Sequence, residues 1–428
     1  MFNHRINRIV IIGNGFDLAH GLPTKYEDFV NWYWKKLLNQ LRQCHDSKLS
    51  NDLCQFTLLQ EGTWYSFLWA NLNPMQMIAG EVFINWVKNN PEIVRFESCH
   101  LLRQITQSIE EKKWVDIEEE YYKLLKLSLD KSNPFLIHPK NLNVQFKALQ
   151  DLLVEYLRTI KCDSIVPNIK LNELIYEPID RKDISVSELD SFDNYYLSLA
   201  NSDEYNIQSI INSYELGDPF LLHDFTHFQE MNKKESVSGS LSVDTIKDFP
   251  KSLIRPSDIL LVSFNYTGLA ERYSNRKIGK AIYIHGKLSN PQGVIFGYGD
   301  EMDEVYKNLL KNANNEYLTN VKTIRYLETD NYDKLLKFIN SAPYQVYIMG
   351  HSCGNSDRTL LNTLFEHNNC VSIKPFYYQK DDGSDNYIEI VQNIHRNFTD
   401  MKLMRERVVN KTYCEPLPQS RSYIEKVE

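Results

Sequence analysis

The sequence lacks three features that would place it in a specialised class of proteins. Its seven cysteines are scattered, with no C-x-x-C pair, which argues against both a paired-cysteine zinc module and a disulfide framework. No apolar run approaches the length of a membrane span, and the N-terminus has no long apolar h-region. Positive charge is also scarce, because 48 Lys and Arg face 56 Asp and Glu, a net charge of −8. We therefore expect a cytoplasmic chain with reduced thiols, no membrane partner and no broad nucleic-acid surface.

The composition is otherwise that of a packed globular protein. Of its 428 residues, 42% are hydrophobic and 24% are charged, and 26 Tyr, 20 Phe and 6 Trp supply ample apolar area for a core. At this length we expect two or three structural units.

The N-terminal segment predicts the first unit of an α/β fold. Residues 8–12 form a β-branched run typical of a strand buried on both faces of a parallel sheet. The run stops at the turn Gly13-Asn14-Gly15, where glycines permit positive φ or close backbone approach. A helix is expected from Thr24, with Pro23 before it and Glu27 completing a capping box. Strand, glycine turn and helix together indicate a doubly wound fold.

Strand patterns return only after Pro256, and each ends in a small or polar cluster. The predicted strands are 259–264, 281–284, 294–296 and 344–349, with 371–378 closing the sheet. The fold class is therefore α/β, with a Rossmann-type, mostly parallel sheet. We expect residues 1–50 and 251–428 to form this nucleotide-binding domain around a large, mainly helical insertion at 51–250.

The predicted strand ends carry the candidate site residues. The glycine turn either faces a pyrophosphate or is a plain tight turn, since the G-x-G-x-x-G fingerprint fails at Leu18. Asn265 could hold a carboxamide or ribose, and His285 suits general-base chemistry near neutral pH. Both could instead only hydrogen-bond to loop backbone.

Three further patterns could be functional or merely structural. Gly350-His351-Ser352 with Asp357 could hold ribose or phosphate, but Asp357 is also a good cap for a helix at 358–366. The acidic helix around Asp116 and Glu118 is by default a solvated face with a buried Trp114. His223 and His227 have the i, i+4 spacing of zinc ligands, yet Asp224 replaces the glutamate of the zinc-protease pattern and no third ligand is evident, so no metal site is expected.

Residues 11–29, IIGNGFDLAHGLPTKYEDF, closely resemble the opening motif of the phage abortive-infection AbiH family. Later motifs of that family are also similar: W-x-D-x-E at Trp114, F-N-Y-T at Phe264, H-G at His285 and G-H-S…D at Gly350. Because these motifs span nearly the whole chain, the resemblance covers the full protein.

The same motifs resemble a divergent sirtuin-type NAD-binding domain. That resemblance implies that His285 is the catalytic base and that Asn265 orients the nicotinamide ribose. It also implies NAD contacts at Gly13, Asn14, Gly15, Asp17, Gly21, Pro23, Tyr26, Phe264, Tyr266, Thr267, Gly286, Gly350, His351, Ser352 and Asp357. The sequence departs from sirtuins at Asn14 and Thr267 and in having Thr24-Lys25-Tyr26 after the proline, which argues against protein deacetylation.

Together these features predict an antiphage effector that binds NAD and hydrolyses its nicotinamide–ribose bond when triggered. A phage-derived trigger or a homo-oligomer would be its partner. One alternative is a non-catalytic module that senses a nucleotide. Another is a metal-dependent nuclease, with Asp17, Asp116, Glu118 and Asp300 as candidate Mg²⁺ ligands.

Overall fold

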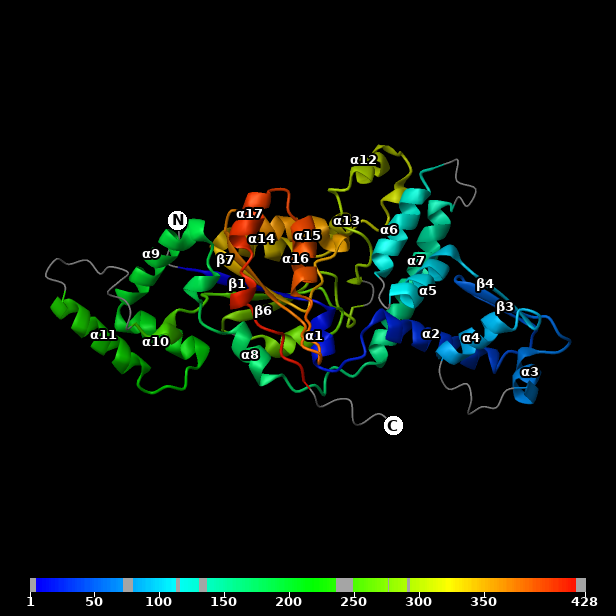
Figure 1. The fold of residues 1–428 in the computed structure, drawn as a ribbon, viewed down its shortest axis with the longest axis horizontal. Helices are drawn as coiled ribbons and strands as arrows, with labels where there is room; N and C mark the ends of the chain where they lie inside the picture. Colours follow the sequence, from blue (N-terminus) through cyan, green and yellow to red (C-terminus); the bar gives the residue numbers. More distant parts are fainter. Residues whose placement is uncertain are drawn as a thin grey trace. The chain divides into compact units, whose positions relative to one another are not determined.

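The computed structural model describes residues 5–71, 80–112, 116–130, 137–235, 249–275, 277–290 and 293–420 (Figure 1). The chain divides into two compact units, each assembled from separate segments. The first unit contains residues 1–22, 162–293 and 326–428, and the second contains 23–161 and 294–325. These boundaries differ from the predicted division at residues 50 and 250.

The first unit contains a five-stranded parallel sheet in the order β6-β5-β1-β7-β8. Its strands are β1 (Asn7–Ile12), β5 (Ile259–Ser263), β6 (Gly279–Tyr283), β7 (Tyr344–Met349) and β8 (Cys370–Phe376). Every residue of β1 and β7 is buried, which explains why both strands are largely apolar. The chain adds β5 and β6 on one side of β1, then β7 and β8 on the other, which is the Rossmann-type order. The expected sheet built from both ends of the chain is confirmed.

Helices of the first unit pack on this sheet or form an adjoining apolar cluster. The helices α15 (Arg358–Phe365), α16 (Tyr387–Arg396) and α17 (Met401–Arg407) contact β8 and gather beside β7 (Figure 1). The remaining α-helices are α1 (Asn14–Ala19), α8 (Ile169–Ile175), α9 (Leu189–Ala200), α10 (Glu204–Tyr214), α11 (Leu221–Glu235) and α14 (Asn331–Ser341). Phe192, Phe225 and Phe249 share one buried cluster with Val371 of β8. This packing explains why residues 162–235 belong to the sheet's unit.

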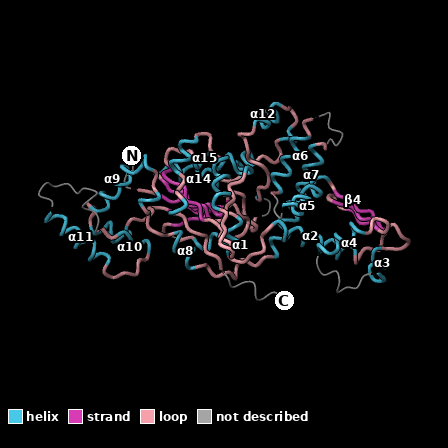
Figure 2. Tube along the Cα trace, viewed as in Figure 1, coloured by secondary structure: helices cyan, strands magenta, loops and turns pink. Residues whose placement is uncertain are grey.

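The second unit is helical but also contains an antiparallel sheet, β2-β3-β4, drawn in magenta around β4 in Figure 2. Its strands are β2 (Lys48–Ser50), β3 (Cys54–Leu58) and β4 (Val94–Ser98). Its α-helices are α2 (Tyr26–Leu41), α3 (Trp64–Asn71), α4 (Gly80–Asn89), α5 (His100–Lys112), α6 (Ile117–Leu127), α7 (Pro139–Thr159), α12 (Glu304–Lys311) and α13 (Lys322–Arg325). The region 51–250, predicted to be mainly helical, thus also contains the two short strands β3 and β4, and β2 precedes it.

Two predicted elements need correction. The helix expected from Thr24 begins at Tyr26, and the Lys25 N–H donates to the Asp28 carboxylate at 3.2 Å. Residues 294–296 form no strand, although all three are buried. There Phe296 stacks on Phe146 with ring centroids 4.7 Å apart, so the apolar run marks burial without strand pairing.

Two of the segments discussed from the sequence cannot be compared with the structure. Trp114 and most of the Ser-rich piece at 235–242 lie outside the described residues. Among the described residues, no helix is long and apolar enough to cross a membrane.

Candidate functional site

Three polar side chains meet beyond the carboxyl ends of β6 and β7. His285 follows β6, while His351 follows β7 and Asp357 precedes α15. The Nε2 atom of His285 lies 3.1 Å from Oδ1 of Asp357, and Nε2 of His351 lies 3.5 Å from its Oδ2. Carboxyl ends of parallel strands share one edge, which is why residues far apart in sequence meet there. Asp357 therefore bridges two histidines, although its side chain makes no capping hydrogen bond to α15.

The hydrogen bonds of His351 define its neutral tautomer. Its Nδ1 accepts the Cys353 N–H at 3.0 Å, so the proton of the neutral ring is on Nε2 and faces Asp357. At His285, Nε2 lies between the Asp357 carboxylate and the Tyr326 hydroxyl, so a proton on Nε2 would be donated to Asp357. A histidine oriented by a carboxylate in this way has the arrangement of a general base.

Aromatic rings surround this His–Asp–His cluster. Phe264 packs against both histidines, with centroids 5.2 Å from His285 and 4.3 Å from His351. The Tyr326 ring stacks on His285, and its hydroxyl lies 3.3 Å from Nε2. His285 is only 3% exposed, so a substrate reaches it only after the covering groups move. Tyr326 was not predicted, because one tyrosine among 26 carries no distinguishing pattern.

A second polar group connects the loop after β5 to the turn after β1. The Asn265 side chain donates to the Gly13 carbonyl at 2.9 Å, and the Thr267 hydroxyl donates to Asp17 Oδ2 at 2.7 Å. Asp17 lies in α1 and is 1% exposed. Thr267 thus serves here as a hydrogen-bond donor to Asp17.

Asp17 is electrostatically unusual among the site residues. Burial raises its pKa to about 7, and hydrogen bonds from Thr267 and Asn265 offset only part of that effect. Its buried Oδ1 atom has no hydrogen-bond partner among the described residues. A ligand hydroxyl or amide placed beside Oδ1 would satisfy it, which makes Asp17 a candidate ligand contact.

Substituting Asp17 should change how stability depends on pH. The folded-state pKa is raised, so Asp17 favours folding below about pH 4 and this stabilisation is lost as pH rises to about 7. In Asp17→Asn the free energy of unfolding no longer falls over this pH range, a fall that amounts to roughly 4 kcal/mol at most in wild type. Between pH 4.5 and 8, the melting temperature of Asp17→Asn minus that of wild type should increase with pH and then level off above about pH 7. The exposed Asp333→Asn should show no such trend, and a flat difference for Asp17→Asn would contradict a raised pKa.

The glycine turn after β1 packs directly against the loop after β7. A Cβ atom at Gly13 would overlap the His351 Cα, and one at Gly15 would lie 2.8 Å from the Gly350 Cα. The N–H groups of Gly13 and Gly15 donate to the carbonyls of Met349 and Gly350. These glycines are therefore required by close backbone packing, which brings His351 beside the first turn.

The remaining residues predicted to contact NAD lie in both structural units. Asn14, Gly21, Tyr266, Gly286 and Ser352 belong to the first unit, where Asn14, Gly21 and Ser352 are exposed. Pro23 and Tyr26 belong to the second unit.

The candidate metal ligands do not form a cluster. Asp116 caps α6 by accepting the N–H groups of Glu118 and Glu119, and Glu118 is buried against Lys322. The default prediction of a solvated acidic face was therefore wrong for Glu118. His223 and His227 lie on α11, with the His223 side chain 77% exposed. Within the described residues, no three His, Cys, Asp or Glu side chains are grouped to hold a metal ion.

The fold and its polar edge define a Rossmann-type α/β protein with a buried His–Asp cluster. Residues 9–379 match the family model described as Bacteriophage abortive infection AbiH. The match covers most of the chain, so this protein belongs to the AbiH family, which connects it with abortive infection of phage. No curated protein and no solved structure matches it. The resemblance to sirtuins stays a prediction.

Proposed function

We propose that this AbiH protein is an abortive-infection effector that hydrolyses the nicotinamide–ribose bond of NAD once it is triggered. The observation that carries the proposal is the buried pair of His285 and Asp357 at the carboxyl edge of a Rossmann-ordered sheet. This edge is where such sheets bind nucleotides. The residues present also suit a ribose, since Asp17 offers a buried acceptor with an unsatisfied oxygen.

In the proposed reaction, the bond between ribose C1′ and nicotinamide breaks, and its electron pair leaves with nicotinamide. A water oxygen bonds to C1′, and His285 Nδ1 takes a water proton. Asp357 stabilises the imidazolium that forms, as a carboxylate partner does for a catalytic histidine. Asn265 and Asp17 would orient the ribose. The N–H groups of Gly13 and Gly15 would not bind the pyrophosphate, because both already donate to backbone carbonyls.

The burial of His285 supports control by a trigger. A base that is 3% exposed is inactive until the groups around it open, which suits an effector that must stay silent in uninfected cells. We infer that the phage-derived signal favours the open state.

The test uses purified wild-type protein with NAD, with and without lysate from infected cells. Nicotinamide and ADP-ribose should accumulate with infected lysate, and His285→Ala should lower the rate about 10²–10⁴-fold. Asp357→Asn should also lower it, by disturbing the orientation of His285. The matched control is His223→Ala, an exposed histidine of the same unit, which should match wild type.

The non-catalytic sensor and the nuclease predict different results for the same protein variants. NAD binding without product, unchanged in His285→Ala, would support a non-catalytic sensor and overturn hydrolysis. Divalent-dependent cleavage of nucleic acid that persists in His285→Ala would support the nuclease.

A further inference from the structure

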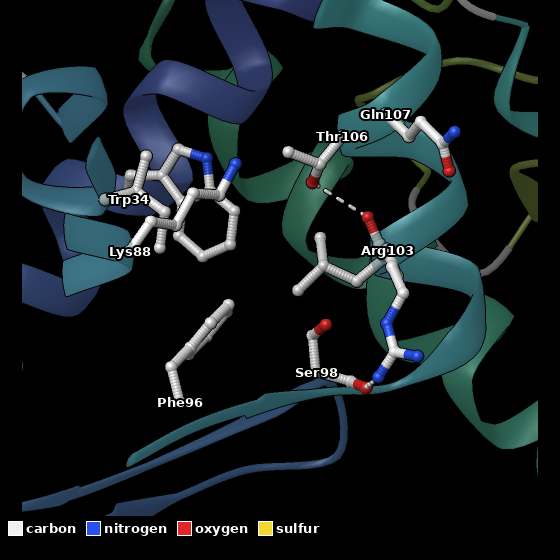
Figure 3. A pocket seen from close by; sticks show the side chains of 9 residues that line it. Trp34, Lys88, Phe96, Ser98, Arg103, Thr106 and Gln107 are labelled. Atoms are coloured by element: carbon white, nitrogen blue, oxygen red, sulfur yellow. Dashed lines mark hydrogen bonds between the residues drawn. The ribbon is translucent and has the colours of Figure 1, made fainter. Parts of the chain in front are cut away.

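A cavity of about 370 Å³ opens in the second unit between α2, α4, β4 and α5 (Figure 3). This volume falls within the range of about 300–1,000 Å³ that is typical of small-molecule sites. All of its lining residues belong to the second unit, so it is separate from the His–Asp–His cluster.

The cavity combines an apolar base with an aromatic wall. Trp34, Ile84 and Leu102 line it and are at most 4% exposed. Phe96 is half-buried and packs against Trp34 and Phe56, with ring centroids 6.1 and 4.7 Å away. A flat aromatic ligand would find stacking area there that needs no side-chain rearrangement.

The remaining lining is polar and positively charged. Lys88 and Arg103 are both exposed, and the lining formed by the described residues includes no carboxylate. Arg103 Nη2 donates to the Ser98 carbonyl at 3.2 Å, which fixes the guanidinium beside the cavity. In Figure 3, Thr106 and Arg103 lie across the cavity from Trp34 and Phe96. A cavity with the Arg103 guanidinium in its wall and no carboxylate among its described lining residues favours an anionic ligand.

We propose that this cavity binds a mononucleotide, with its base against Phe96 and its phosphate held by Arg103. The aromatic wall and Arg103 line one small cavity, so the ligand that fits both carries an aromatic ring and a negative charge. A nucleoside lacks the anion, and inorganic phosphate lacks the ring. This site does not depend on the proposed NAD chemistry.

The test is calorimetric titration of the full chain with the four ribonucleoside monophosphates, their nucleosides and inorganic phosphate. At least one monophosphate should bind about tenfold or more tightly than its nucleoside and than phosphate. Arg103→Gln should weaken that binding about tenfold or more, because it removes charge-assisted hydrogen bonds to the phosphate.

The matched control is Arg95→Gln, because Arg95 is an exposed arginine of β4 that does not line the cavity. This variant should leave binding unchanged. Phe96→Leu should weaken binding of the monophosphate while leaving phosphate binding unchanged. His285→Ala should bind like wild type, which separates this site from the NAD proposal. Absence of monophosphate binding at millimolar concentration, or equal effects of Arg95→Gln and Arg103→Gln, would overturn the proposal.

Discussion

Gly350→Ala should destabilise the first unit by about 3–5 kcal/mol, since two costs add. Gly350 has φ +74°, a left-handed conformation that side chains disfavour. A Cβ atom there would also overlap the Phe16 backbone nitrogen and lie 2.5 Å from the Gly15 carbonyl carbon, and backbone atoms cannot move aside as flexible side chains do. Chemical denaturation followed by tryptophan fluorescence and circular dichroism should show the lost stability as a lower denaturant concentration at the unfolding midpoint.

The control for Gly350 is another glycine with the same backbone conformation. Gly383 has φ +82°, but no atom of the described residues lies within 4 Å of the position that a Cβ would take, so Gly383→Ala carries the conformational cost alone. That variant should lose only about 1–2 kcal/mol. Equal losses at the two positions would show that the contact between the first turn and the β7 loop is not tight.

Lys322→Met should destabilise the second unit by about 3–5 kcal/mol, because it leaves a buried carboxylate without its cation. The Lys322 side chain is 0% exposed, and its Nζ lies 2.9 Å from Glu118 Oε2. The other carboxylate oxygen accepts the Gly297 N–H at 2.8 Å, so Glu118 connects α6 to the segment that contains Lys322. Thermal and urea unfolding would measure the loss.

Two further variants separate burial from charge pairing. Lys147→Met breaks an exposed pair with Asp151 and should change stability by less than about 1 kcal/mol. Adding Glu118→Gln to Lys322→Met removes the uncompensated charge and should recover part of the loss. A Lys322→Met protein as stable as the Lys147→Met protein would contradict a structural role for the Glu118 ion pair.

The parallel sheet was predictable because its strands are buried on both faces. Residues 8–12, 259–263 and 344–349 are buried without interruption and largely apolar, a pattern that few other elements show. The antiparallel sheet was missed because β2, β3 and β4 have only three to five residues each and lie among helical patterns. Residues 294–296 were wrongly predicted as a strand, since a buried loop can be as apolar as a strand.

The candidate site was predictable where it depends on strand ends. His285, His351 and Asp357 meet because parallel strands deliver their carboxyl ends to one edge. The contact between Thr267 and Asp17 and the position of Tyr326 were not predictable, since each joins residues without a periodic pattern. The buried Glu118 was also missed, because its partner Lys322 is 204 residues away in sequence.

The most direct test of the proposed function is the NAD content of infected cells. Cultures expressing wild type, His285→Ala or His223→Ala would be infected with a phage that wild type restricts, and NAD and nicotinamide would be quantified through one infection cycle. We predict that NAD falls and nicotinamide rises with wild type and His223→Ala, while His285→Ala keeps NAD at the uninfected level and loses protection. Protection by wild type with NAD unchanged would contradict the account.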